Sequence, residues 1–196
     1  YGLILALAII PSGRLGDLFG HRRLFLLGTV ILAAASLVCG IANSPFLLIA
    51  GRFVQGLGAG MLVPQTLTLI GITFPEAARG RAVGIWGSIA GTASIIGPLV
   101  GGVLIDGLSW RWVFFINLPI AVLVVILGLR SLPTGVTQAS KFDLVGTLLA
   151  GVGLVALLYG CLQGPHAGWD PVTIACLPFA VLLSLIHISE PTRRTP

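Results

Sequence analysis

The sequence predicts an all-α fold, a polytopic bundle of membrane-spanning helices. Hydrophobic residues make up 56% of the 196 residues and charged residues only 9%, which leaves too little polar surface for a water-soluble domain. Uncharged runs recur that are long enough, at about 1.5 Å per helical residue, to cross a hydrocarbon core about 30 Å thick. Basic residues gather between alternate runs, so the net charge of +5 indicates membrane topology rather than nucleic-acid binding.

The apolar runs divide the chain into two regions of predicted helices. Residues 1–130 form a helix bundle with approximate spans at 1–13, 24–42, 46–74, 82–105 and 112–129. Residues 131–182 form a linker and two further spans, at 143–163 and 172–182. Because successive spans cross in opposite directions, all but one of the basic residues outside the spans and before position 183 fall on one side: Arg14, Arg22, Arg23, Arg79, Arg81, Arg130 and Lys141, against Arg111 alone. This bias places loops 13–23, 75–81 and 130–142 in the cytoplasm of a multi-pass cell-membrane protein.

The segment 13–23, GRLGDLFGHRR, holds the densest cluster of charge before residue 183. A cytoplasmic loop explains its arginines but not its glycines or Asp17. The glycines would allow a tight turn and close helix approach, and Asp17 would pair with an arginine or lie at a helix N-terminus. The pattern resembles the signature between the second and third helices of the major facilitator superfamily. The resemblance implies a conformational latch that consists of Gly13, Asp17, Gly20, Arg22 and Arg23.

The span 46–74 contains a cation, Arg52, with Gln55 three residues further on. An arginine at membrane depth is costly unless it finds water, a partner or the interface, and Arg52 lies near enough to one end to extend toward the interface. A cation and an amide on one helix face favour the other interpretation, a polar interior. The run from Arg52 to Gly60 resembles the motif of the fourth superfamily helix, which implies a role in proton coupling or in the substrate cavity. Gly56 and Gly60 form a small-xxx-small pair for packing.

The span 82–105 carries small residues along one face. Gly84, Gly87, Gly91, Ser94, Pro98 and Gly101 follow one another at intervals of three or four residues. Such a seam lets a neighbouring backbone come close, and Pro98 removes a helical hydrogen bond and bends the helix. The spacing is compatible with tight packing alone and with a bent, thin-walled helix beside a cavity.

The same span provides the closest link to one branch of that superfamily. The residues that resemble the antiporter motif of its drug:proton antiporters are Gly87, Gly91, Gly97, Pro98, Gly101 and Gly102. The sequence Ser109–Val122 is similar to the entry into the next helix of the fourteen-helix branch. The resemblance implies the major facilitator fold, with residues 1–130 as an N-terminal six-helix bundle that lacks its first helix and residues 131–182 as the linker and extra central helices.

The two ends of the chain have unusual features. Tyr1 lies within an apolar segment, which predicts a fragment of a longer protein. Residues 183–196, LSLIHISEPTRRTP, resemble the translation of transposase adapter DNA used in library preparation, which predicts a non-native tail. A natural helix end with a basic tail is the alternative.

The resemblance implies proton-coupled efflux of hydrophobic or cationic drug-like molecules by alternating access. The implied partners are the lipid bilayer, a small-molecule substrate and protons. Three alternatives stay open: an exporter of another solute (siderophore, lipid or amino acid), a truncated fragment that transports nothing by itself, and a helix-packing membrane protein without transport. No nucleophile–base pair, phosphate loop or metal-ligand spacing occurs, so we expect no enzyme, no cofactor and no metal. The oligomeric state is left open.

Overall fold

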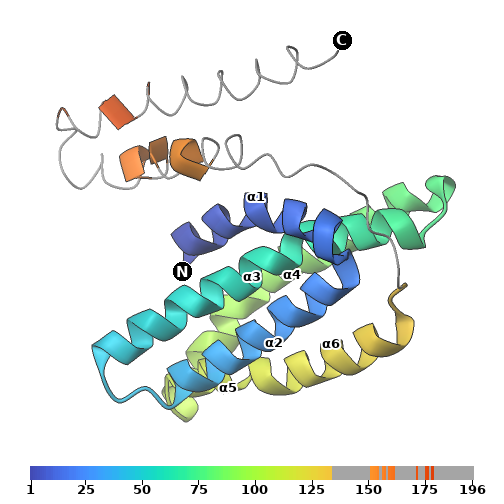
Figure 1. The fold of residues 1–196 in the computed structure, drawn as a ribbon. Helices are drawn as coiled ribbons and strands as arrows, with labels where there is room; N and C mark the ends of the chain where they lie inside the picture. The colour runs from blue at the N-terminus through green and yellow to red at the C-terminus, as the bar shows by residue number, and fades with distance from the viewer. Residues whose placement is uncertain are drawn as a thin grey trace.

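In a computed structural model of the chain, residues 1–133 are described, together with short pieces at 151–154, 156–157, 159–161, 171, 175–176 and 178. Residues 1–133 form six helices and no strand, which confirms the predicted all-α fold (Figure 1). The helices are α1 (Gly2–Phe19), α2 (His21–Gly40), α3 (Pro45–Thr73), α4 (Glu76–Gly107), α5 (Trp112–Phe115) and α6 (Asn117–Ser131).

The core of the bundle lies between α1, α2 and α3. Helix α3 packs against both α1 and α2, and α2 lies between α3 and α6 (Figure 1). Helix α4 contacts only α3 and α5 among the described helices. Five segments of residues 1–133 are long and apolar enough to cross a membrane, if α5 and α6 are taken together as Trp112–Ser131.

The prediction that residues 13–23 form a loop is wrong, because all of them except Gly20 are helical. Helix α1 continues to Phe19 and α2 begins at His21, so Gly20 alone separates them. Gly20 has φ 94°, a conformation that side chains with a Cβ rarely adopt. The apolar run marks the depth of the bilayer, whereas a helix satisfies its own backbone and can extend beyond that depth. For the same reason α4 already begins at Glu76, within the predicted loop 75–81.

Several other predictions concern residues that the structure mostly does not describe. They are the loop 130–142, the linker region 131–182 with its spans 143–163 and 172–182, and the tail 183–196. The described pieces at 151–154, 156–157 and 159–161 are helical.

Glycines of α3 allow close helix contacts on two of its faces. A Cβ on Gly60 would lie 2.5 Å from the Ala8 Cβ of α1, and a Cβ on Gly56 would lie 2.9 Å from the Tyr1 carbonyl. On the other face, a Cβ on Gly58 would lie 2.9 Å from the Gly28 carbonyl of α2. Bulkier residues would push these helices apart, so the glycines set the distance between them.

The small-residue seam of α4 has no such neighbour. Helix α4 has no buried residue, and a Cβ added at Gly84, Gly87, Gly91, Gly97, Gly101 or Gly102 would meet nothing within 4 Å. Within the described residues, the seam therefore packs against no other helix. Its hydroxyls donate to their own helix, as Ser94 does to the Ala90 carbonyl at 3.0 Å.

Two contacts define the turn between α2 and α3. Ser44 caps α3, because its side-chain oxygen accepts from the Leu47 N–H at 3.2 Å, and Pro45 occupies the first helical turn. From the α4–α5 turn, Arg111 donates to the Ala42 carbonyl at 3.1 Å. These contacts hold two connections together at the same end of the bundle.

Candidate functional site

A cavity of about 590 Å³ lies among α2, α3, α5 and α6, and both residues predicted for a polar interior reach it. Its lining consists of Tyr1, Leu32, Leu48, Arg52, Gln55, Val113, Phe114 and Asn117. Three of these side chains are polar or charged and two are aromatic. The cavity therefore offers hydrogen-bonding groups between apolar helices.

Arg52 is the charged group of this cavity. Its guanidinium donates to Gln55 Oε1 at 2.8 Å and lies 4.4 Å from the centre of the Tyr1 ring and 5.7 Å from that of Phe114. Aromatic faces attract a cation and partly replace its lost hydration. Within the described residues, no carboxylate forms an ion pair with Arg52. The cavity therefore carries a positive charge that Gln55 and two rings hold in place.

A buried hydroxyl links three of the helices that surround the cavity. Ser36 of α2 is fully buried, and its Oγ accepts from Gln55 Nε2 at 2.8 Å and from Asn117 Nδ2 at 3.2 Å. The sequence analysis did not single out Ser36 or Asn117. Each is a polar residue in an apolar run, but serine is common in membrane helices, and only the packing of α2, α3 and α6 shows that the three residues meet.

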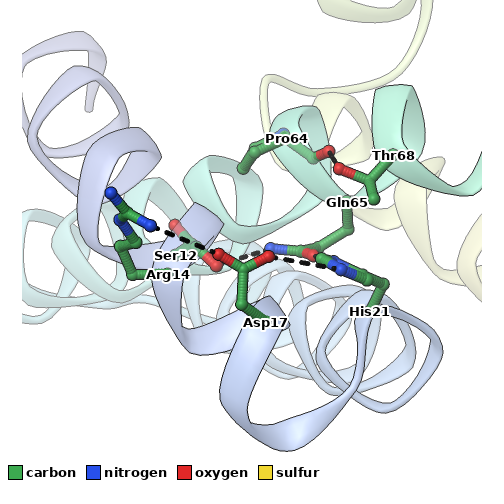
Figure 2. A network of polar contacts seen from close by, with 7 residues as sticks. All are labelled: Ser12, Arg14, Asp17, His21, Pro64, Gln65 and Thr68. Atoms are coloured by element: carbon green, nitrogen blue, oxygen red, sulfur yellow. Dashed lines mark hydrogen bonds and ion pairs between the residues drawn. The ribbon is translucent and has the colours of Figure 1, made fainter. Parts of the chain in front are cut away.

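A second polar cluster lies where α1 turns into α2 (Figure 2). Gln65 of α3 is fully buried and His21 is 7% exposed. Gln65 Nε2 donates to the Ser12 carbonyl at 2.6 Å, and Gln65 Oε1 lies 2.7 Å from His21 Nδ1. His21 Nε2 lies 3.4 Å from Asp17 Oδ1. Of these residues, only Asp17 belongs to the latch predicted from the sequence.

A proline explains the position of Ser12. Pro64 lies inside α3 and has no N–H, so the Gly60 carbonyl lacks its usual helical donor. Ser12 Oγ lies 3.1 Å from that carbonyl and is also hydrogen-bonded to the Ala8 carbonyl of its own helix. This contact holds the C-terminal half of α1 against α3. The distribution of charge predicts that this half lies toward the cytoplasm.

The charged latch residues have different surroundings. Asp17 lies 3.8 Å from the exposed Arg14 Nη1. Arg22 Nη2 donates to the Leu129 carbonyl in the last turn of α6 at 2.6 Å, whereas Arg23 is exposed. Arg22 therefore connects α2 to α6, and the structure does not bring Arg23 into this cluster.

The glycines of the latch are also unequal. Gly13 has room, because an added Cβ would lie 3.8 Å from Pro64 Cβ. Gly16, which was not predicted as a site residue, has none: an added Cβ would lie 2.1 Å from Gln65 Oε1 and 2.6 Å from His21 Nδ1. The glycine at 16 is therefore needed for the cluster, and Gly20 is needed for the turn.

The two sites consist of hydrogen-bonding and charged side chains. Among the described residues, no group of three or more histidine, cysteine or acidic side chains could hold a metal ion. A bundle of helices long and apolar enough to cross a membrane, with a polar cavity and a charged cluster at one end, places the chain in the class of multi-pass membrane proteins.

The chain belongs to the major facilitator superfamily. The model of that family, described as Major Facilitator Superfamily, matches residues 1–192. A relative named multidrug resistance protein Stp, from Mycobacterium tuberculosis (strain CDC 1551 / Oshkosh), is 40% identical over 88% of this chain and 32% of its own length. The methylenomycin A resistance protein of Bacillus subtilis (strain 168) is 35% identical over 100% of the chain and 43% of its own length.

A third relative is named for transport as well as resistance. The tetracenomycin C resistance and export protein of Streptomyces glaucescens is 35% identical over 93% of this chain and 34% of its own length. The chain thus spans about a third to two fifths of the length of these curated relatives.

Proposed function

We propose that this chain forms part of a proton-coupled efflux transporter for hydrophobic, drug-like molecules. Arg52 carries the proposal: a guanidinium without a carboxylate partner among the described residues lines a cavity between membrane helices. An intramembrane cation is costly and typically marks a substrate or proton path. The names of the relatives, which include multidrug resistance and export, support an outward direction of transport.

Each group of site residues has a proposed role. Arg52 and Gln55 provide the polar surface of the cavity in residues 1–130, to which the substrate or a proton-carrying group binds. Asp17, Gly20 and Arg22 act as the cytoplasmic latch, which holds one conformer and opens in the other. The seam from Gly87 to Gly102 acts as the wall that flexes and seals during alternating access.

The test uses the complete reading frame that encodes this chain, purified and reconstituted in liposomes. An imposed proton gradient should drive a fluorescent cationic or neutral dye across the membrane. Arg52→Ala and Asp17→Asn should each lower the initial rate at least about tenfold, the loss expected when a transition or conformer loses about 1.4 kcal/mol of stabilisation. The matched control is Thr68→Val, which removes a half-buried hydroxyl that donates to the Pro64 carbonyl of its own helix at 3.0 Å.

Two negative results have different meanings. If the parent protein moves no dye in either direction under a gradient, the proposed function is wrong. If the parent transports and both variants match it, the function stands but the roles of Arg52 and Asp17 do not.

A further inference from the structure

The orientation of the Gln65 side chain is fixed by a group that can only accept. The Ser12 carbonyl lies 2.6 Å from Gln65 Nε2, and a backbone carbonyl has no proton to give. The reverse orientation of the amide would place two oxygens against each other in a buried site. Gln65 Oε1 therefore faces His21 Nδ1, 2.7 Å away.

This orientation determines which ring nitrogens of His21 carry protons. Because Gln65 Oε1 is an acceptor, His21 Nδ1 must donate to it. The other nitrogen, Nε2, faces Asp17 Oδ1 at 3.4 Å, and an ionised carboxylate also only accepts. A neutral ring would direct a lone pair at one of these two oxygens. The arrangement as a whole therefore fits an imidazolium with a proton on each nitrogen.

We infer that Gln65 is a positioning residue for the latch: it holds His21 as a doubly protonated ring against Asp17, so that this conformer keeps a proton on the α1–α2 turn. The inference rests on the proposed function for its meaning in transport, because only a transporter needs a latch. The latch predicted from the sequence includes Asp17 but none of the other residues of this cluster. The inference adds Gln65, Ser12 and His21 to it.

Among the charged groups near His21, the Asp17 carboxylate favours a proton on the ring and the arginines oppose it. Helix α1 contributes Asp17 and, in contact with its carboxylate, Arg14. Helix α2 contributes Arg22, whose Nη2 is directed to the Leu129 carbonyl, and the exposed Arg23. Helix α3 contributes no titratable group near His21, since its only charged residue is Arg52, thirteen positions before Gln65.

Helix α3 also connects the latch to the cavity. Gln55 lines the cavity and Gln65 lies ten residues further on, which corresponds to about 15 Å along one helix. A movement of α3 that displaces Gln65 would remove the acceptor from His21 Nδ1. Binding in the cavity and the proton on His21 are in this way linked through one helix.

The first experiment measures the ring directly. In the complete protein in lipid, histidine labelled with ¹⁵N gives signals that distinguish a doubly protonated ring from either neutral tautomer, and His21→Arg identifies the signal of His21. We expect a doubly protonated population in the parent and its loss in Gln65→Met, which keeps the volume but has neither polar end. A parent protein that shows only a neutral ring would overturn the inference.

The second experiment separates positioning from mere packing. Gln65→Met and Asp17→Asn should each slow transport about tenfold, as expected for one lost buried hydrogen bond to a charged group. The double variant should be no slower than either single one, because both changes break the same chain of contacts. If the two losses multiply instead, Gln65 acts only through packing and the inference fails.

Thr68→Val is the matched control for both experiments. Thr68 lies one turn beyond Gln65 on α3 and donates only to the Pro64 carbonyl of its own helix, at 3.0 Å (Figure 2). Its substitution should change neither the His21 signal nor the transport rate. Because the ¹⁵N signal needs no transport, a parent that fails to transport would refute the proposed function and leave the protonation of His21 measurable.

Discussion

His21 Nδ1 and Gln65 Oε1 lie 2.7 Å apart although 44 positions separate the two residues in the sequence. The contact joins the first residue of α2 to the buried face of α3, immediately beside the turn at Gly20. A polar contact in so buried a place is costly to break, because both groups lose their water on folding. The turn between α1 and α2 is therefore a defined structure and not a loose connection.

Gly16→Ala should disrupt this contact. The added methyl would lie 2.1 Å from Gln65 Oε1, and relief of that overlap should lower the free energy of unfolding by about 1–3 kcal/mol. Gly13→Ala is the control, because its methyl would meet only Pro64 Cβ at 3.8 Å. It should be neutral, or stabilising by up to about 1 kcal/mol. Thermal unfolding of both variants in detergent checks this, and equal midpoints would contradict it.

Ser36→Ala should weaken the cavity. Gln55 Nε2 and Asn117 Nδ2 both donate to Ser36 Oγ, so the change leaves one buried and one half-buried amide without their partner. Interhelical hydrogen bonds in membranes contribute on average about 0.6 kcal/mol each, which gives an expected loss of about 1 kcal/mol of stability. The measurement is equilibrium unfolding in mixed micelles. Ser94→Ala, at an exposed position on α4, should show no such loss.

Arg22→Gln and Arg23→Gln should differ although the residues are neighbours. Arg22 donates to the Leu129 carbonyl, a C-terminal group of α6 that favours a cation. Its loss should cost about 1 kcal/mol and speed hydrogen exchange in the last turn of α6. Arg23 is exposed, and its loss should leave that exchange unchanged. Faster exchange in both variants to the same degree would show that net charge matters and the contact does not.

Gly91→Leu in the complete reading frame tests the seam of α4. Within the described residues nothing lies within 4 Å of an added Cβ at Gly91, so the change should not affect insertion or the stability of residues 1–133. Transport should fall at least about tenfold, because a wall that must approach another helix cannot carry a large side chain. Val103→Leu, at a site 73% exposed, is the control for added bulk away from the seam. Normal transport by Gly91→Leu would refute the role of the seam.

The helices could be predicted from the sequence because hydropathy is a local property. The pairing of Arg52 and Gln55 could also be predicted locally, because residues three positions apart lie on the same face of a helix. Their side chains are hydrogen-bonded at 2.8 Å. The end of α1 was misplaced because apolar residues report the depth of the bilayer and not the end of a helix. The turn at Gly20 could not be distinguished from a longer loop on hydropathy.

The partners of these residues could not be found locally. Ser36 and Asn117 meet across 81 positions, and Gln65 reaches Ser12 across 53. Such pairs depend on how α1, α2, α3 and α6 cross, which the small residues of α3 control. The sequence pointed to Gly56 and Gly60 of α3, which do make close contacts, and also to the glycines of α4, which have no neighbour in the described residues.

Because Gly20 is the single residue between α1 and α2, the connection cannot absorb a change in length. One residue inserted between Phe19 and His21 would change the orientation of α2 relative to α1 and would turn the histidine ring away from both of its oxygen neighbours. A reporter or epitope spliced at this point would thus misalign the two helices, even though the site lies at a chain reversal where insertions are ordinarily harmless.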